Sequence, residues 1–152
     1  MDTETTTKTP WHLWLIGALA TAWNAIGPYD YIQTQTGNLD YFKSSEEMMG
    51  VDGATALAYF QDLPAWIDAC WALGVWGALI GSILLLLRSR YAVWSFAISL
   101  FGLAGSTFGQ LARGMPEWAS GGSNTIFTIV IWSIATFLLI YAVSMRNKGV
   151  LR

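Results

Sequence analysis

Four long apolar segments are separated by more polar ones along this chain of 152 residues. They cover residues 9–29, 69–87, 91–112 and 118–145, and none contains Asp, Glu, Lys or Arg. A helix needs about 20 mainly apolar residues to cross a hydrocarbon layer about 30 Å thick, and each segment is long enough or nearly so. The pattern therefore predicts an all-α integral membrane protein, a bundle of four transmembrane helices with a long outer loop that carries short helices.

We place the helices at about residues 11–31, 64–87, 91–112 and 125–145 of a single membrane domain, residues 1–152, with a flexible tail at 1–9. Asn38 and Asp52 are good helix caps, so the outer loop at 32–63 should carry a short helix after each. Ser123 or Asn124 should cap the fourth helix. The outer loop either covers the end of the bundle or lies along the membrane surface as an amphipathic segment.

Composition supports a membrane location and excludes some partners. Only 12% of the residues are charged, about half the usual share in soluble domains. The net charge of −2 and the lack of a Lys/Arg run argue against nucleic acid as a partner. We expect the lipid bilayer as the main partner, with a homo-oligomer or a larger membrane complex. A single cysteine, Cys70, allows no intrachain disulfide.

Basic residues indicate the orientation. With both termini on one side, that side holds six of them and the other only two, Lys43 and Arg113. The six are Lys8, Arg88, Arg90, Arg146, Lys148 and Arg152. Cytoplasmic segments carry the excess of Lys and Arg, so both termini should be cytoplasmic. A cleaved signal peptide is the alternative for the first segment, and Asp2 and Glu4 argue against it.

Two sequence patterns, WNAxGxxDYxxTQTxN and PAWxxAxWAxGVWG, begin at Trp23 and Pro64, and the chain ends in MRNKGVLR. Over nearly its whole length the chain thereby resembles an uncharacterised family of small four-span membrane proteins, found mostly in proteobacteria. Some members are loosely labelled sugar transporters. The resemblance implies the four-span topology and a location in the bacterial inner membrane, multi-pass with both termini cytoplasmic, and it assigns no catalytic or binding residue.

Two acidic residues are candidates for a polar site. Asp68 lies one turn inside the second helix, where a carboxylate must be wet, paired or protonated. Asp30 follows the Gly27-Pro28 break in the first helix, near Thr21 and Asn24, and could join them in a polar notch. The simpler interpretation gives Asp68 contact with water or Arg113, and makes Asp30 a helix-capping residue.

Aromatic and small residues supply two further sets of candidates. Four tryptophans fall at depth and could contact a hydrophobic ligand: Trp23, Trp71, Trp76 and Trp132. Six glycines should allow close helix packing: Gly74, Gly77, Gly81, Gly102, Gly105 and Gly109. With one histidine, His12, and one cysteine, the sequence offers no metal-binding set, no nucleophile–base pair and no implied cofactor.

These observations leave four function classes open. An accessory or scaffolding subunit fits the small-residue faces and the lack of a catalytic set. A small oligomeric or proton-coupled carrier would use Asp30 and Asp68. A binder of a quinone, pigment or lipid would use the four tryptophans. An enzyme is the least favoured class, because no catalytic residues are visible.

Overall fold

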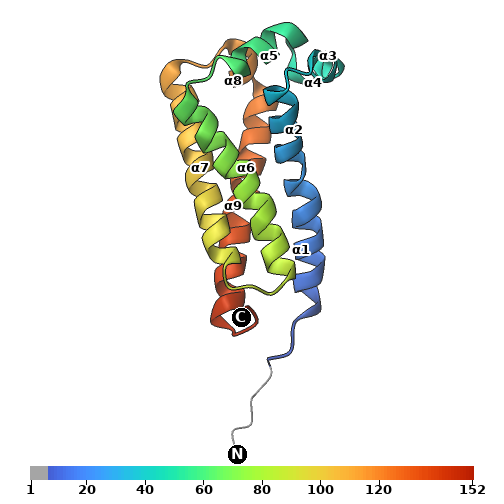
Figure 1. The fold of residues 1–152 in the computed structure, drawn as a ribbon, viewed down its shortest axis with the longest axis vertical. Coiled ribbons are helices and arrows are strands. Elements are labelled where there is room, and N and C mark those ends of the chain that lie inside the picture. The colour runs from blue at the N-terminus through green and yellow to red at the C-terminus, as the bar shows by residue number, and fades with distance from the viewer. Residues whose placement is uncertain (1–6) are drawn as a thin grey trace, which may run out of the picture.

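The computed structural model describes residues 7–152, which form helices and no strand. The long helices are α6 (Ala65–Leu86), α7 (Ala92–Arg113) and α9 (Gly122–Asn147), and α1 (Trp11–Asn24) and α2 (Ile26–Gln35) lie alongside them (Figure 1). The short helices are α3 (Leu39–Ser44), α4 (Glu46–Met49), α5 (Gly53–Gln61) and α8 (Glu117–Ser120). Of the predicted flexible tail at 1–9, residues 1–6 lie outside the described part.

Three helices, α6, α7 and α9, are long and apolar enough to cross a membrane. Their most apolar stretches have mean hydropathies of 2.0, 1.4 and 2.4. Large apolar side chains point outward from them, and Phe101 on α7 and Ile140 on α9 are 70% and 64% exposed. Such side chains are stable in contact with lipid, as in an integral membrane protein.

The single helix predicted for 11–31 is interrupted at Ala25 and continues to Gln35. Pro28 explains the interruption, because it has no N–H to donate to the Asn24 carbonyl one turn earlier. Ala25 keeps helical dihedrals of φ −72° and ψ −23°, so α2 extends onward from α1 in nearly the same direction (Figure 1).

The antiparallel helices α6 and α7 approach closely through the six glycines. Added Cβ atoms at Gly74, Gly77 and Gly81 would lie 2.8–3.3 Å from atoms of α7. Across the same interface, Ser99 Oγ donates to the Gly74 carbonyl at 2.6 Å. On α7, an added Cβ at Gly102 would lie 2.5 Å from the backbone nitrogen of Gly74. The predicted close-packing glycines therefore join these two helices within one chain.

One end of the bundle carries the start of α1, the end of α9 and the α6–α7 link, and we call it the terminal end (Figure 1). Gly149, at φ 71°, reverses the chain after α9, which lets the N–H of Val150 bond to the Met145 carbonyl at 3.0 Å. Arg152 then pairs with the link: its N–H donates to the Arg88 carbonyl at 2.7 Å, and its carbonyl accepts from the Arg90 N–H at 2.9 Å.

The other end is the capped end, covered by α3, α4, α5 and α8 (Figure 1). As predicted, Asn38 caps α3, and Asp52 caps α5 by accepting from the Thr55 N–H at 3.1 Å. Phe60 of α5 lies 5.6 Å from the ring of Trp71 on α6. The predicted outer loop therefore packs over the end of the bundle, which favours the first of its two interpretations.

The predicted cap of α9 is wrong. The helix begins at Gly122, with Gly121 at the capping position and no side-chain cap. Asn124 lies inside the first turn, and its amide donates to the Trp118 carbonyl of α8. The amide thus joins α8 to α9 and does not cap its own helix.

Candidate functional site

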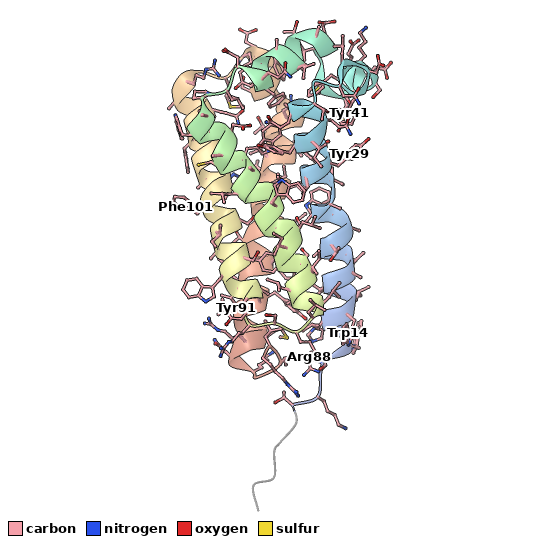
Figure 2. The ribbon with its side chains drawn as sticks, viewed as in Figure 1. Trp14, Tyr29, Tyr41, Arg88, Tyr91 and Phe101 are labelled. Atoms are coloured by element: carbon pink, nitrogen blue, oxygen red, sulfur yellow. The ribbon has the colours of Figure 1, made fainter. Side chains whose placement is uncertain are left out.

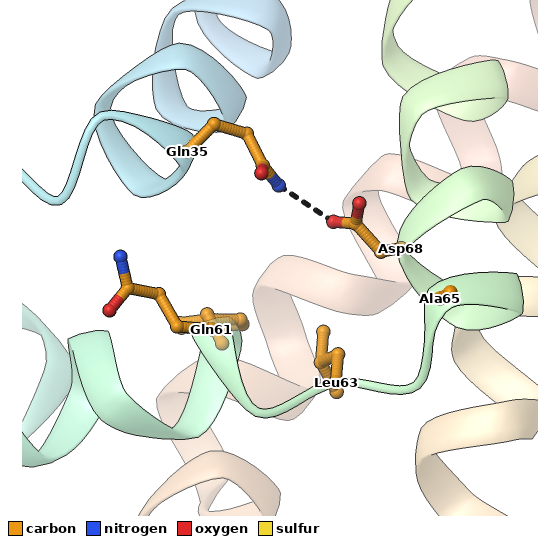
Figure 3. A pocket seen from close by; sticks show the side chains of 6 residues that line it. Gln35, Gln61, Leu63, Ala65 and Asp68 are labelled. Atoms are coloured by element: carbon orange, nitrogen blue, oxygen red, sulfur yellow. Dashed lines mark hydrogen bonds between the residues drawn. The ribbon is translucent and has the colours of Figure 1, made fainter.

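Asp68 lies in the first turn of α6 at the capped end, where two residues of α2 hold its carboxylate. Gln35 Nε2 donates to Oδ1 at 2.8 Å, and the Tyr31 hydroxyl donates to Oδ2 at 3.2 Å. Figure 3 shows Gln35 and Asp68 facing each other near the α5–α6 connection. The simpler interpretation gave Asp68 contact with water or Arg113, but Arg113 pairs with Asp62, because α7 ends beside the residues that follow α5.

A hollow of about 410 Å³ opens beside Asp68. Its lining comes from α2, α5, α6 and the α5–α6 connection: Gln35, Phe60, Gln61, Leu63, Ala65 and Asp68. Gln61 Nε2 donates to the Thr34 carbonyl at 3.2 Å, so it ties α5 to α2 along this hollow. Its lining sets three polar side chains against three apolar ones, and small-molecule sites likewise combine apolar walls with a few polar groups.

Asp30 belongs to a different polar contact. The Tyr41 hydroxyl of α3 donates to its carboxylate, and the Thr34 hydroxyl donates to its backbone carbonyl at 2.9 Å. Burial raises the pKa of Tyr41 above its usual value near 10, and the hydrogen bond to Asp30 and the charge of Asp30 raise it further. The structure gives Asp30 and Asp68 separate tyrosine partners, so they do not form one pair.

The polar notch predicted around Asn24 is also divided. Asn24 Nδ2 donates to Ser82 Oγ on α6 at 2.8 Å, and Thr21 donates to the Gly17 carbonyl of its own helix at 2.8 Å. Neither side chain has a hydrogen bond to Asp30. Asn24 joins α1 to α6, because the face of α6 that carries Ser82 lies against α1.

The four candidate tryptophans lie in different places. Trp23 packs on Phe127 with ring centroids 6.2 Å apart. Trp71 packs on Tyr31 at 5.1 Å, and Trp132 packs on Phe108 at 6.3 Å. Trp76 is 39% exposed on the outside of α6. Three of the rings thus make separate contacts between helices and the fourth faces outward, so the four do not converge on one ligand.

Sequence reasoning missed Tyr31, Gln35 and Gln61. Tyr31 and Gln35 are four residues apart, so they lie on one face of α2, and that spacing was the available signal. Which residue they face depends on the path of the outer loop, which no local pattern gives. Across residues 7–152, no three His, Cys, Asp or Glu side chains are grouped to hold a metal ion. His12 Nδ1 lies 2.5 Å from the Tyr141 hydroxyl.

Exposed apolar side chains surround the helices over their length, and polar or charged side chains gather at both ends (Figure 2). Together with three helices of membrane-spanning length and hydropathy, this defines a helical membrane protein. No family model, no curated protein and no solved structure matches the chain.

Proposed function

We propose that this chain is a four-span protein of the bacterial inner membrane, with both termini in the cytoplasm, that acts as an accessory or scaffolding subunit and forms a homo-oligomer. The resemblance to the uncharacterised four-span family supports the same topology. The proposal rests on the path of α1 and α2, on the charges at the two ends, and on an apolar groove along α7.

The fourth span would consist of α1 and α2 together. Alone, each is too short to cross the hydrocarbon layer, but residues 11–35 at about 1.5 Å each extend about 37 Å. Hydrogen bonds continue across the interruption, from the Ala25 N–H to the Thr21 carbonyl at 3.0 Å and from the Tyr29 N–H to the Ala25 carbonyl at 3.3 Å. The exposed apolar residues Leu15, Leu19 and Ile26 would face lipid.

Charge supports the orientation. The six basic residues at the terminal end are Lys8, Arg88, Arg90, Arg146, Lys148 and Arg152, and the capped end has Lys43 and Arg113. All the acidic side chains within residues 7–152 fall at the capped end: Asp30, Asp40, Glu46, Glu47, Asp52, Asp62, Asp68 and Glu117. The excess of Arg and Lys favours a cytoplasmic terminal end.

The proposed oligomer rests on one observation, an open groove of about 310 Å³ on the outside of α6 and α7. Its lining is almost wholly apolar: Trp66, Phe101, Ala104, Gly105, Phe108, Gly109 and Ala112. Two of these lining side chains, Phe101 and Phe108, project outward and are 70% and 63% exposed. Small residues let two membrane helices approach closely, and the same face offers bulky side chains to fill the space.

A second copy of this chain is the occupant that fits the groove. A two-fold interface needs a surface that complements itself, because the same patch faces its own copy. Here protruding rings and small residues alternate along one face of α7, so Phe101 or Phe108 of one copy can pack over Ala104 or Ala112 of the other. Such an interface leaves α9 and α1 free to contact lipid or a further subunit.

Native mass spectrometry of the protein released from lipid nanodiscs tests this assembly. We expect a dimer, and we expect Phe101→Ala with Phe108→Ala to increase the monomer fraction about tenfold, since each removes a packed ring at the interface. Leu19→Ala is the matched control, because Leu19 is 62% exposed on α1, away from the groove. A wild-type protein that stays monomeric at high protein-to-lipid ratio would overturn the oligomer.

A carrier is the second candidate, favoured by the polar contacts between α6 and the α1–α2 pair. Asp68 lies at the capped end of this interface, and the Asn24–Ser82 hydrogen bond lies further along it. If these groups mark a solute path, Asp68→Asn should abolish solute-coupled proton uptake in reconstituted vesicles. Unchanged uptake in that variant would remove the carrier proposal and leave the scaffold proposal intact.

A further inference from the structure

The hollow beside Asp68 offers hydrogen-bond acceptors from three side chains. Gln35 and Gln61 each direct an amide nitrogen to another protein oxygen, the Asp68 carboxylate and the Thr34 carbonyl respectively. Each amide oxygen is then left as an acceptor. The residues that line the hollow thus carry one negative charge and two neutral amide oxygens, which suits a ligand that donates hydrogen bonds.

The charge of Asp68 has no cationic partner within residues 7–152. The one ion pair there joins Arg113 to Asp62, and Asp68 is held only by the neutral donors Tyr31 and Gln35. Hydrogen bonds from neutral donors stabilise a carboxylate without cancelling its charge. The acidic excess at the capped end adds a negative field that attracts cations to this opening.

The size and the walls of the hollow favour an organic cation over a metal ion. Phe60 lines it, and Phe60 packs on Trp71, which packs on Tyr31 at 5.1 Å. Aromatic rings attract organic cations through their negative faces. A Ca²⁺ ion would need six to eight oxygen ligands at about 2.3–2.6 Å, whereas a space of about 410 Å³ accommodates a small molecule.

We propose that this hollow binds a primary ammonium group, with Asp68 as the counter-ion, the Gln35 and Gln61 amide oxygens as hydrogen-bond acceptors, and Phe60 as an aromatic wall. The ammonium group belongs either to a soluble amine or to the ethanolamine headgroup of a membrane lipid. Both present the same –NH₃⁺ donor, and the hollow lies at the end of the helices, where headgroups and soluble molecules are both accessible. The site is independent of the groove on α7.

Equilibrium dialysis of radiolabelled butylammonium at pH 7 tests the site in the full chain, embedded in phosphatidylcholine nanodiscs. Phosphatidylcholine has a quaternary ammonium with no N–H to donate, so it should leave the site open. We expect saturable binding after subtraction of empty nanodiscs, and at least a tenfold loss of affinity in Asp68→Asn. Asp62→Asn, which removes a neighbouring carboxylate already paired with Arg113, should change the affinity by less than twofold.

A second variant guards against misfolding of Asp68→Asn, and a change of lipid identifies the source of the amine. Ala65→Phe keeps the carboxylate but fills the hollow, so it should also weaken binding tenfold, and it keeps the test valid if Asp68→Asn misfolds. Nanodiscs made with phosphatidylethanolamine should reduce butylammonium binding if the lipid headgroup is the occupant, and leave it unchanged if a soluble amine is. Any one of three results would overturn the proposal. These are no saturable binding by the wild type, equal binding by the wild type and Asp68→Asn, and competition by 1-butanol as strong as that by the amine.

Discussion

Two tyrosines, Tyr31 and Tyr41, each donate a hydrogen bond to a carboxylate at the capped end. In each case a neutral phenol holds a negative charge in place, and the pair joins two separate helices. The pair of Tyr41 and Asp30 connects α3 to α2, so a single proton on Tyr41 helps to hold the outer loop over the bundle. Loss of that proton would set two negative charges side by side.

Stability of the capped end should therefore fall at high pH. The pKa of Tyr41 is raised in the folded state. The stability that its hydrogen bond to Asp30 contributes is therefore fully present below the unfolded-state pKa near 10, and it is lost as pH rises from there through the folded-state pKa. Tyr41→Phe should destabilise the protein by about 1 kcal/mol at pH 7 and make thermal unfolding less steeply dependent on pH above about 10. Melting curves followed by circular dichroism measure both effects.

Tyr91→Phe controls for the loss of a hydroxyl, since Tyr91 is 59% exposed at the terminal end. If the Tyr41→Phe protein loses stability with alkaline pH as steeply as the wild type, the pair with Asp30 does not hold the outer loop.

At the scale of elements, α6 and α7 depend on backbone contact at Gly102. A Cβ there would lie 2.5 Å from the Cys70 carbonyl oxygen and 2.5 Å from the Gly74 nitrogen, both backbone atoms that cannot turn aside. Gly102→Ala should destabilise the protein by about 1–3 kcal/mol. Unfolding in mixed detergent micelles, followed by tryptophan fluorescence, measures the change.

Gly105→Ala provides the matched comparison on the same helix. Its nearest contact is Cys70 Sγ at 2.5 Å, the end of a side chain that can rotate away. Both variants gain similar helix propensity, so the difference between them isolates the backbone contact. A Gly105→Ala variant less stable than Gly102→Ala would contradict the packing described for these helices.

The apolar pattern was sufficient to predict the long helices because hydropathy is a local property. It predicted one helix for 11–31, whereas Pro28 divides that segment at Ala25 and the helical path continues to Gln35. Polar residues such as Thr34 and Gln35 gave no apolar signal, since they lie at the capped end and form hydrogen bonds with Asp30, Gln61 and Asp68.

Pairings between distant segments were less accessible from the sequence. Arg113 could be assigned to Asp68 or to Asp62 with equal chemical reason, and the choice depends on how the outer loop folds over the bundle. The caps Asn38 and Asp52 were predictable because each bonds to a backbone N–H only three residues away. Local hydrogen bonds follow from spacing, whereas partners across the fold do not.

For the whole molecule, the orientation can be tested with single cysteines. In a Cys70→Ala background, Lys148→Cys should react with a membrane-impermeant maleimide only after the inner membrane is broken. Glu47→Cys should react in intact spheroplasts, because the capped end faces outward in the proposed topology. Both residues are exposed, so access to the side chain does not limit the reaction. Labelling of Lys148→Cys in intact spheroplasts would reverse the orientation.

The pairing of Arg152 with Arg88 and Arg90 bears on the order in which this end of the bundle forms. A polypeptide leaves the ribosome in sequence order, so helices α1 to α9 are made before residues 150–152 can reach the α6–α7 link. Until then the buried apolar cluster that includes Leu13, Leu85 and Phe96 lacks two of its members, Val150 and Leu151. The backbone hydrogen bonds of Arg152 therefore form late in biogenesis. A chain cut before Val150 would keep its helices but would lack these bonds.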